Sequence, residues 1–586
     1  MDALADPLDD IVQRLSPFLQ RNAPVDVLDL YPGPGLLSSK INQLLNPRRH
    51  VFFEPEFKHY EPILGPLIES RSCNELVSRP PPALDAWGDL LNKHFPEQGP
   101  SNTDSSGELP INDTLLVLAH VPPAVSTKDH FSGDKWLTLF MNQALNQTGL
   151  HRYGSVRLLA LAQPSSLASI FPRNINGRSR QSLSVEQVAR HAFEVAAVPT
   201  GDRQNHAYLR QWESVSAAAK RTEQRTQEGN VVVPAGREFP PMRMALDSAR
   251  FGVQQKVPFE PRAQTEQHEK YTLFLEQEKR NSAKDKAIEK ERVRVRAKLS
   301  ADDQHVHRRM LIASKMGQAD EINKSIARVA ADPKSTYAAL EPMAQEAENL
   351  SAAFEEAILN SHYDTTRTIP QFVDDRRFSL HTGNIDDSLY VHDRRPFEPL
   401  LVHTDELYPR NEPQTWIYFE ADPNAAVARR LNRLDKEKRE IATIFISVLS
   451  SSFKPKQHLT VHKLFELVFP PRSANDMVKA VPGLAKFAFK APKPNFDELP
   501  KTLHYNQDDI PSGQEPDPVN CYQENLNYDV SRIHCRILPV STLWDIAIEY
   551  AHQDTVHSPL QLRRILGATV TRAQDRVFDD KMTRKW

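Results

Sequence analysis

The chain has 586 residues, and this length excludes a single small domain. Its 73 Lys and Arg residues nearly balance 76 Asp and Glu residues, so the formal charge of −3 excludes a chain-wide attraction to nucleic acid and any basic surface must be local. Three cysteines without C-x-x-C spacing argue against a zinc site and a disulfide framework, and no apolar run reaches the roughly 18 residues that span a bilayer. We therefore expect no metal and no membrane partner.

The first elements form a β-turn-α-β pattern. Residues 8–20 have apolar side chains at helical spacing, and "VDVLDLY" after them predicts a short buried strand. A glycine turn follows, then a helical stretch, "LLSSKINQLL", and a second strand, "HVFFEPE". A unit of this kind, spanning residues 25–54, implies parallel strands.

Further strands and helices alternate up to about residue 200. The continuous apolar runs at 114–123 and 155–166 are typical of strands buried on both faces, and "WLTLFMNQAL" between them predicts a helix. The alternation predicts an α/β fold, with a mostly parallel sheet covered by helices on both sides.

The character of the sequence changes after this first part. Residues 268–299 are dense in both charges and predict one long solvated helix, paired with "MAQEAENLSAAFEEAIL", whereas "HYDTTRTIPQFVDDRR" indicates an extended connection. Two apolar runs around a Pro/Asn turn within 400–423 predict a hairpin. The expected organisation is an α/β core at 1–204, a charged insertion at 205–394, a hairpin completing the core sheet at 395–424, a small helical domain at 425–490 and a Pro/Asp-rich extension at 491–586.

The glycine turn has the pattern D-x-x-P-G-x-G, with Asp29, Gly33 and Gly35, and Glu54 ends the next strand. Glycines after a strand let the backbone approach a ligand, and an acid about 20 residues later usually reaches ribose hydroxyls. Position 38 is Ser38 where a dinucleotide fingerprint has a third glycine, which disfavours NAD and FAD. The alternative is a tight turn without a ligand, with Glu54 as a surface residue.

These segments resemble the rRNA adenine N6-dimethyltransferase family, and within it the fungal mitochondrial transcription initiation factors of the factor-B type. The resemblance rests on "LDLYPGPGLLSS", "HVFFEPE", "LLVLAHVPP", "WIYFEADP" and the run "HRYGSVRLLALAQPSSLASIFPRNINGRSRQSLSVEQVARHAFEVAAV". It covers about residues 10–200 and, more weakly, 395–490. It implies a class I methyltransferase (Rossmann-like) fold and S-adenosylmethionine as a possible, vestigial cofactor, contacted by Asp29, Tyr31, Gly33, Gly35, Glu54, Asp85 and His120.

The sequence departs from the family where the target adenine is held. Active members have Asn-Leu/Ile-Pro-Tyr/Phe after the fourth strand, whose amide and ring hold the flipped base. Here His120 replaces the Asn and Pro123 replaces the aromatic residue. An imidazole cannot reproduce the paired donor and acceptor of an amide. Methyl transfer is therefore doubtful, and no catalytic residue is assigned beyond His120 at the target-base position.

A loop after the strand at 155–162 is the predicted nucleic-acid surface. Arg173, Asn174, Arg178 and Arg180 have the side-chain types that bind phosphates and bases, although a solvated loop is the alternative. Tyr408 and Trp416 could stack on an unpaired base, but aromatic residues in a hairpin more often belong to the core. The insertion either binds nothing or forms a docking surface for a partner protein or DNA.

Three functions are consistent with this sequence. The first, implied by the resemblance, is a mitochondrial transcription initiation factor that joins the mitochondrial RNA polymerase and helps to melt promoter DNA. The second is an S-adenosylmethionine-dependent rRNA adenine N6-methyltransferase, and the third is an rRNA-binding assembly protein. The first implies the mitochondrial matrix, although the acidic start "MDALADPLDD" is unlike an Arg-rich presequence.

Overall fold

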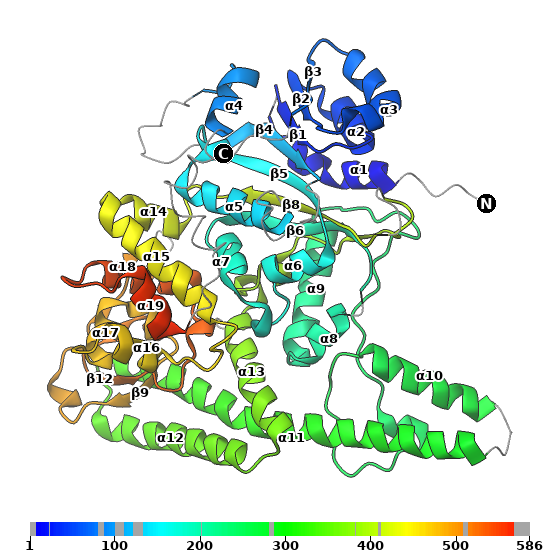
Figure 1. The fold of residues 1–586 in the computed structure, drawn as a ribbon. Coiled ribbons are helices and arrows are strands. Elements are labelled where there is room, and N and C mark those ends of the chain that lie inside the picture. Colours follow the sequence, from blue (N-terminus) through cyan, green and yellow to red (C-terminus); the bar gives the residue numbers. More distant parts are fainter. Residues whose placement is uncertain are drawn as a thin grey trace.

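The structure is a computed structural model of the chain. It describes residues 7–22, 24–79, 87–99, 111–120, 133–200, 202–280, 286–380, 383–407, 412–507 and 514–567. An eight-stranded sheet with the order β3-β2-β1-β4-β5-β8-β6-β7 lies at its centre (Figure 1). The strands are β1 (Asp26–Leu30), β2 (Arg49–Phe53), β3 (Asn74–Val77), β4 (Ile111–Ala119), β5 (Ser155–Ala162), β6 (Ala189–Ala197), β7 (Leu400–Leu401) and β8 (Thr415–Ala421). All strands run parallel except β8, which is antiparallel to both β5 and β6.

Helices cover both faces of this sheet, which confirms the predicted mixed α/β architecture. Every residue of β1, β5 and β8 is buried, as the continuous apolar runs predicted. Alternate side chains enter two cores: Leu28 of β1 packs toward α5, whereas Val27 packs toward α1. The helices of this part are α1 (Pro7–Leu19), α2 (Leu36–Leu45), α3 (Phe57–Glu69), α4 (Trp87–His94), α5 (Gly133–Asn146), α6 (Pro164–Ile170) and α7 (Arg180–Glu186).

The predicted hairpin at 400–423 is wrong. The short strand β7 pairs with β6, whereas β8 inserts between β5 and β6, so the two strands are not neighbours. The second apolar run does complete the core sheet, because all seven residues of β8 are buried there. Trp416 is 6% exposed and belongs to the core, while Tyr408 lies outside the described residues.

The insertion is more helical than the sequence predicted. Its helices are α8 (Asp202–Tyr208), α9 (Trp212–Glu228), α10 (Glu266–Arg280), α11 (Lys286–Ala331), α12 (Tyr337–Leu359) and α13 (Tyr363–Ser379). Residues 268–299 do not form one helix: they belong to α10 and to the first part of α11, which pack against each other. The segment expected to be an extended connection is α13, whose Phe372 and Asp374 are buried.

Helix α12 pairs with α11, but not through residues 268–299 as the sequence predicted, because the α11 residues that share a core with Leu340 and Phe354 of α12 begin at Ile312. Buried side chains recur every three or four residues along α11, from Val295 to Ala330, and give this helix an apolar stripe. Charged residues on the other faces obscured the stripe in the sequence.

A buried ion cluster joins the insertion to the core. The Arg210 guanidinium donates to Asp375 of α13 (Nε–Oδ2, 3.0 Å) and to both oxygens of Asp393 (2.8 and 2.9 Å), and all three residues are almost fully buried. Asp375 also accepts the Ile175 N–H from the loop after α6 and the Tyr390 hydroxyl. Because buried charges require partners, this cluster fixes four distant segments relative to one another.

Residues 426–566 form one unit, not a helical domain followed by an extension. Strand β9 (Phe489–Pro492) crosses the predicted boundary at 490 and pairs antiparallel with β12 (Leu526–Asp529). Helix α15 (Lys436–Ser452) packs against α18 (Val540–Ala551), where the rings of Phe445 and Tyr550 are 4.6 Å apart. The other elements are α14 (Ala426–Asn432), α16 (Val461–Val468), α17 (Ala474–Ala480), β10 (Leu503–His504), β11 (Tyr522–Gln523) and α19 (Pro559–Leu566).

Replacing Arg210 tests whether this cluster holds the two parts together. We expect Arg210→Met to lower the free energy of unfolding by about 3–5 kcal/mol, because it leaves two buried carboxylates without their cation. Urea unfolding followed by circular dichroism measures the change. The matched control is Arg221→Met, which removes a partly exposed pair with Asp386 and should change the free energy of unfolding much less, because solvent screens this pair. Equal effects of the two substitutions would contradict this account.

Candidate functional site

The glycine turn lies at the carboxyl edge of the parallel strands, where β1, β2 and β4 end together. Backbone hydrogen bonds hold the edge: the Tyr31 N–H donates to the Phe53 carbonyl and the His120 N–H donates to the Leu30 carbonyl, both at 2.9 Å. The chain then turns sharply, with φ of 58° at Tyr31, 58° at Gly33 and 72° at Gly35. Such left-handed conformations suit glycine and are uncommon for tyrosine.

Gly35 is required by packing as well as by its φ angle. A Cβ at this position would lie 2.6 Å from Cδ1 of Leu64, a fully buried side chain of α3. Helix α3 is therefore pressed against the start of α2. The second glycine therefore allows α3 to pack closely against the turn, rather than allowing a ligand to approach.

Glu54 is turned into the protein and not toward solvent. Its Oε2 accepts the Gly33 N–H and its Oε1 accepts the Glu56 N–H, both at 2.9 Å, and the residue is 3% exposed. Burial raises the pKa of this carboxyl, while the two backbone donors oppose the shift. The interpretation of Glu54 as a surface residue is wrong, since the residue is buried, with one oxygen on the glycine turn and the other on the backbone that begins α3.

Asp29 lies at the end of a buried polar chain. The Asn42 amide donates to Nδ1 of His50 at 2.9 Å, and Nε2 on the other side of the ring faces the Asp29 carboxylate at 3.4 Å. His50 and Asp29 are almost completely buried. The sequence analysis missed His50, although a histidine opening the second strand, eight residues after Asn42, was the available signal.

His120 faces a cavity beside the glycine turn. Desolvation lowers the pKa of His120 to about 4, against the opposing charge of Asp29, so the imidazole is neutral at physiological pH. The cavity has an empty volume of about 580 Å³, part of it open to solvent. Its lining includes Asp29 and His120 at the strand ends and three apolar residues that the sequence analysis did not connect to this site: Leu8 of α1, Leu161 of β5 and Trp416 of β8.

These residues fit S-adenosylmethionine only in part. Asp29 and His120 line the cavity, but the Gly33 N–H that would face a ligand is already bonded to Glu54, the acid expected to bind ribose. The Gly33 N–H would have to leave Glu54 before it could donate to a ligand, and Glu54 is not among the residues that line the cavity. Asp85 and Pro123, which complete the family pattern, lie outside the described residues.

The predicted nucleic-acid loop is a buried junction, which corrects its assignment as a surface. Arg178 is 1% exposed: it bonds Glu186, donates to the Leu538 carbonyl at 2.8 Å and lies 4.5 Å over the Phe378 ring. Its charge is satisfied inside the protein. A guanidinium in this position cannot reach a phosphate, and it joins the core to α13 and the C-terminal unit instead.

Neighbours of Arg178 in this loop also have internal partners. Arg173 donates to both oxygens of Glu194 (2.6 and 2.9 Å). Asn174 is 2% exposed and accepts the Asn176 and Gly177 N–H groups as a helix cap. Arg180 is half-buried at the start of α7, beside Trp544 of the C-terminal unit. The structure thus brings these four residues together as a structural joint.

Comparison with known proteins identifies no family for this chain. No protein-family profile matches it, and no curated protein sequence is significantly similar to it. Among the described residues, no group of three His, Cys, Asp or Glu side chains is placed to hold a metal ion. Over the same residues, every helix is too short or too polar to cross a bilayer.

Two glycines near the site should respond oppositely to alanine. We expect Gly35→Ala to destabilise the fold by about 2–4 kcal/mol, because of its positive φ and the clash with Leu64. Gly65→Ala, within α3, meets no atom closer than 3.9 Å and should stabilise by about 0.5–1 kcal/mol. Thermal unfolding of both variants measures the difference. A stable Gly35→Ala protein would show that the turn is not packed as described.

The depressed pKa of His120 predicts acid sensitivity. The unfolded state binds this proton near pH 6.5 and the folded state only near pH 4, so the free energy of unfolding falls as pH drops through this window. We expect His120→Gln to show a smaller loss of thermal stability between pH 7 and pH 5 than the unsubstituted protein. The control is His59→Gln, which removes a histidine whose side chain is 75% exposed on another part of the surface. An unchanged profile in His120→Gln would show that His120 is not desolvated.

Proposed function

We propose that the protein is a mitochondrial transcription initiation factor built on a class I methyltransferase fold, which assists the mitochondrial RNA polymerase in promoter recognition and melting. The observation that carries the proposal is Glu54, whose Oε2 accepts the Gly33 N–H of the glycine turn while its Oε1 accepts the Glu56 N–H at the start of α3. The strand-turn-helix architecture of a nucleotide site is present. The Glu54 carboxylate that would bind the ribose forms hydrogen bonds to the backbone instead.

The sheet supports the methyltransferase class. In a dinucleotide-binding fold the sheet is parallel throughout, whereas the family resembled here has an antiparallel strand near the end of the chain's core. Strand β8, antiparallel between β5 and β6, has this arrangement. Ser38, in place of a third glycine, points the same way because it disfavours a pyrophosphate-binding turn.

The residue at the target-base position supports a role without chemistry. His120 stands where active family members have an asparagine, and its imidazole is neutral and partly buried. A neutral ring has one donor and one acceptor on opposite edges, which does not match the amino group and ring nitrogen of adenine as an amide does.

The cavity beside the turn favours rRNA adenine N6-methyltransferase as the second candidate. A space of about 580 Å³ lined by Asp29, His120 and Trp416 could admit a small ligand if Glu54 released Gly33. This alternative requires methyl transfer, which the first proposal does not.

Two assays on the purified chain separate the candidates. We expect no transfer of labelled methyl groups from S-adenosylmethionine to a small-subunit rRNA helix with adjacent adenines, because neither Glu54 nor His120 is placed for it. We also expect the chain to increase promoter opening by the mitochondrial RNA polymerase, measured as the fluorescence of 2-aminopurine at the start site.

An active rRNA dimethyltransferase is the positive control for the first assay, and polymerase alone is the baseline for the second. His120→Asn should leave the methylation result unchanged, since the amide alone does not free Glu54. Methyl transfer without any effect on promoter opening would reject the proposal and establish the enzyme.

A further inference from the structure

One face of α11 is basic and free of acids. The helix has 11 Lys and Arg residues and 6 Asp and Glu residues. Five of its cations recur at intervals that place them on one side, because successive residues turn by about 100°. They are Lys286, Lys290, Arg294, Arg308 and Lys315, and all are exposed except the half-buried Lys315. We call this side the basic face of α11.

Uncharged residues occupy the remaining positions of the basic face. They are Val293, Ala297, Ala301, Gln304 and Leu311, and all of them are exposed. Val293 and Leu311 are 56% and 58% exposed, which is high for large apolar side chains. Small and apolar residues between the cations leave a smooth surface that a large partner can approach.

Acids of α11 lie on its other sides, where several are neutralised. Asp303 accepts from Arg262 at 2.6 Å and is buried against the preceding loop, and Asp302 pairs with the same arginine. On the basic face, the structure records one ion pair for the described cations, between Arg294 and Glu291 at 3.3 Å with both side chains exposed. Such a pair is worth little, so the positive charge of the face is not cancelled.

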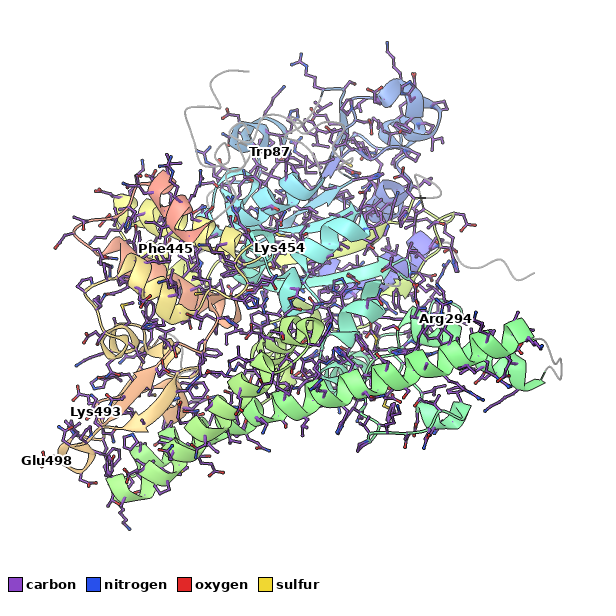
Figure 2. All side chains as sticks on the ribbon, turned by 60° about the horizontal axis from the view of Figure 1, so that its bottom comes forward. Trp87, Arg294, Phe445, Lys454, Lys493 and Glu498 are labelled. Carbon is purple, nitrogen blue, oxygen red and sulfur yellow. The ribbon has the colours of Figure 1, made fainter. Side chains whose placement is uncertain are left out.

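Packing presents the basic face rigidly. Val295 and Leu299, on the opposite side of α11, join a small core with Leu275 of α10 and with Phe251 and Val253 of the preceding loop. Figure 2 shows α11 crossing the front of the molecule, with Arg294 on the part that extends beyond the sheet domain. The cations therefore sit on a straight, supported helix and not on a flexible tail.

We propose that the basic face of α11 binds the phosphate backbone of double-stranded B-form DNA. From Lys286 to Lys315 the face spans roughly 44 Å, and Lys286, Lys290 and Arg294 are about 6 Å apart along the axis. Duplex DNA carries a charge per about 1.7 Å, so phosphates are available to both groups of cations, the three from Lys286 to Arg294 and the two at Arg308 and Lys315, which lie roughly 21 Å of helix apart.

Groove dimensions favour DNA over duplex RNA. The major groove of B-form DNA is about 12 Å wide and admits a helix, whereas the deep, narrow major groove of A-form RNA does not. The short side chains at Ala297 and Ala301 let the helix approach closely. Five of the ten positions are cations, which can meet the phosphates of any sequence, so we expect affinity to depend mainly on salt and little on sequence.

This inference concerns a surface remote from the glycine turn and deepens the proposed role by naming how duplex DNA is held. The test uses the full chain and a 20-base-pair duplex without promoter sequence, in the absence of polymerase. Fluorescence anisotropy at several salt concentrations gives the dissociation constant and its salt slope. The variant is Lys286→Gln, Lys290→Gln, Arg294→Gln and Arg308→Gln together.

We expect the quadruple variant to bind the duplex more than about ten-fold more weakly at 0.1 M salt. Its salt slope should fall by about three to four, which is near one for each phosphate that the variant leaves without a cation. The matched control removes four exposed lysines from other surfaces, Lys58, Lys93, Lys220 and Lys454, and so makes the same change in net charge. It should keep most of the affinity. Unchanged circular dichroism shows that both variants are folded.

Three outcomes would overturn the inference. They are no binding of the duplex by the unsubstituted chain at low salt, an equal loss in the variant and the control, and equal or tighter binding of an RNA duplex that depends on the same four residues. Promoter opening with polymerase is measured separately. A chain that opens promoters but fails here keeps the proposed function and loses only this surface.

Discussion

The buried cluster around Arg210 is the constraint on which the arrangement of this protein depends. One guanidinium is held between Asp375 and Asp393, and Asp375 also receives the Ile175 N–H and the Tyr390 hydroxyl. These contacts bring together the core, the first part of the insertion and the segment that leads back to β7 and β8. Buried charges must keep their partners at hydrogen-bonding distance, because the loss of one partner costs several kcal/mol. The insertion is thereby a fixed part of the fold, and the loop after α6 is drawn into the interior.

The same inward turning of polar groups shapes the nucleotide-like site. Glu54 bonds the backbone of Gly33, and Gly35 allows α3 to pack closely rather than a ligand to approach. His120 is kept neutral by burial beside Asp29. Gly33, Glu54 and Asp29 each have a partner inside the protein. Contacts within the protein hold the turn in place without a ligand. This is consistent with the proposal that the fold binds other macromolecules.

Charge is distributed in a way that the net value of −3 conceals. Buried arginines such as Arg178 and Arg210 form ion pairs inside the protein, so they add no positive charge to the outer surface. Along α11, Asp302 and Asp303 meet Arg262 on one side of the helix, while the cations of the basic face lie on another. Burial of one sign and exposure of the other can create a local field on a nearly neutral chain.

Local sequence determined the strands and the helices of the core, because a strand buried on both faces needs a continuous apolar run and a tight strand-to-helix turn needs residues such as Gly33 and Gly35. It also indicated helices in the insertion, but not their bounds, since residues 268–299 divide between α10 and α11. Tertiary structure alone decided the position of β8 between β5 and β6, the inward direction of Glu54, the burial of Arg178 and the continuity of residues 426–566. Most of these depend on partners far away in the chain, as Arg178 and the Leu538 carbonyl illustrate. An arginine in a polar loop has the same local pattern whether it meets a phosphate or a distant carbonyl, and only the packed chain distinguishes the two.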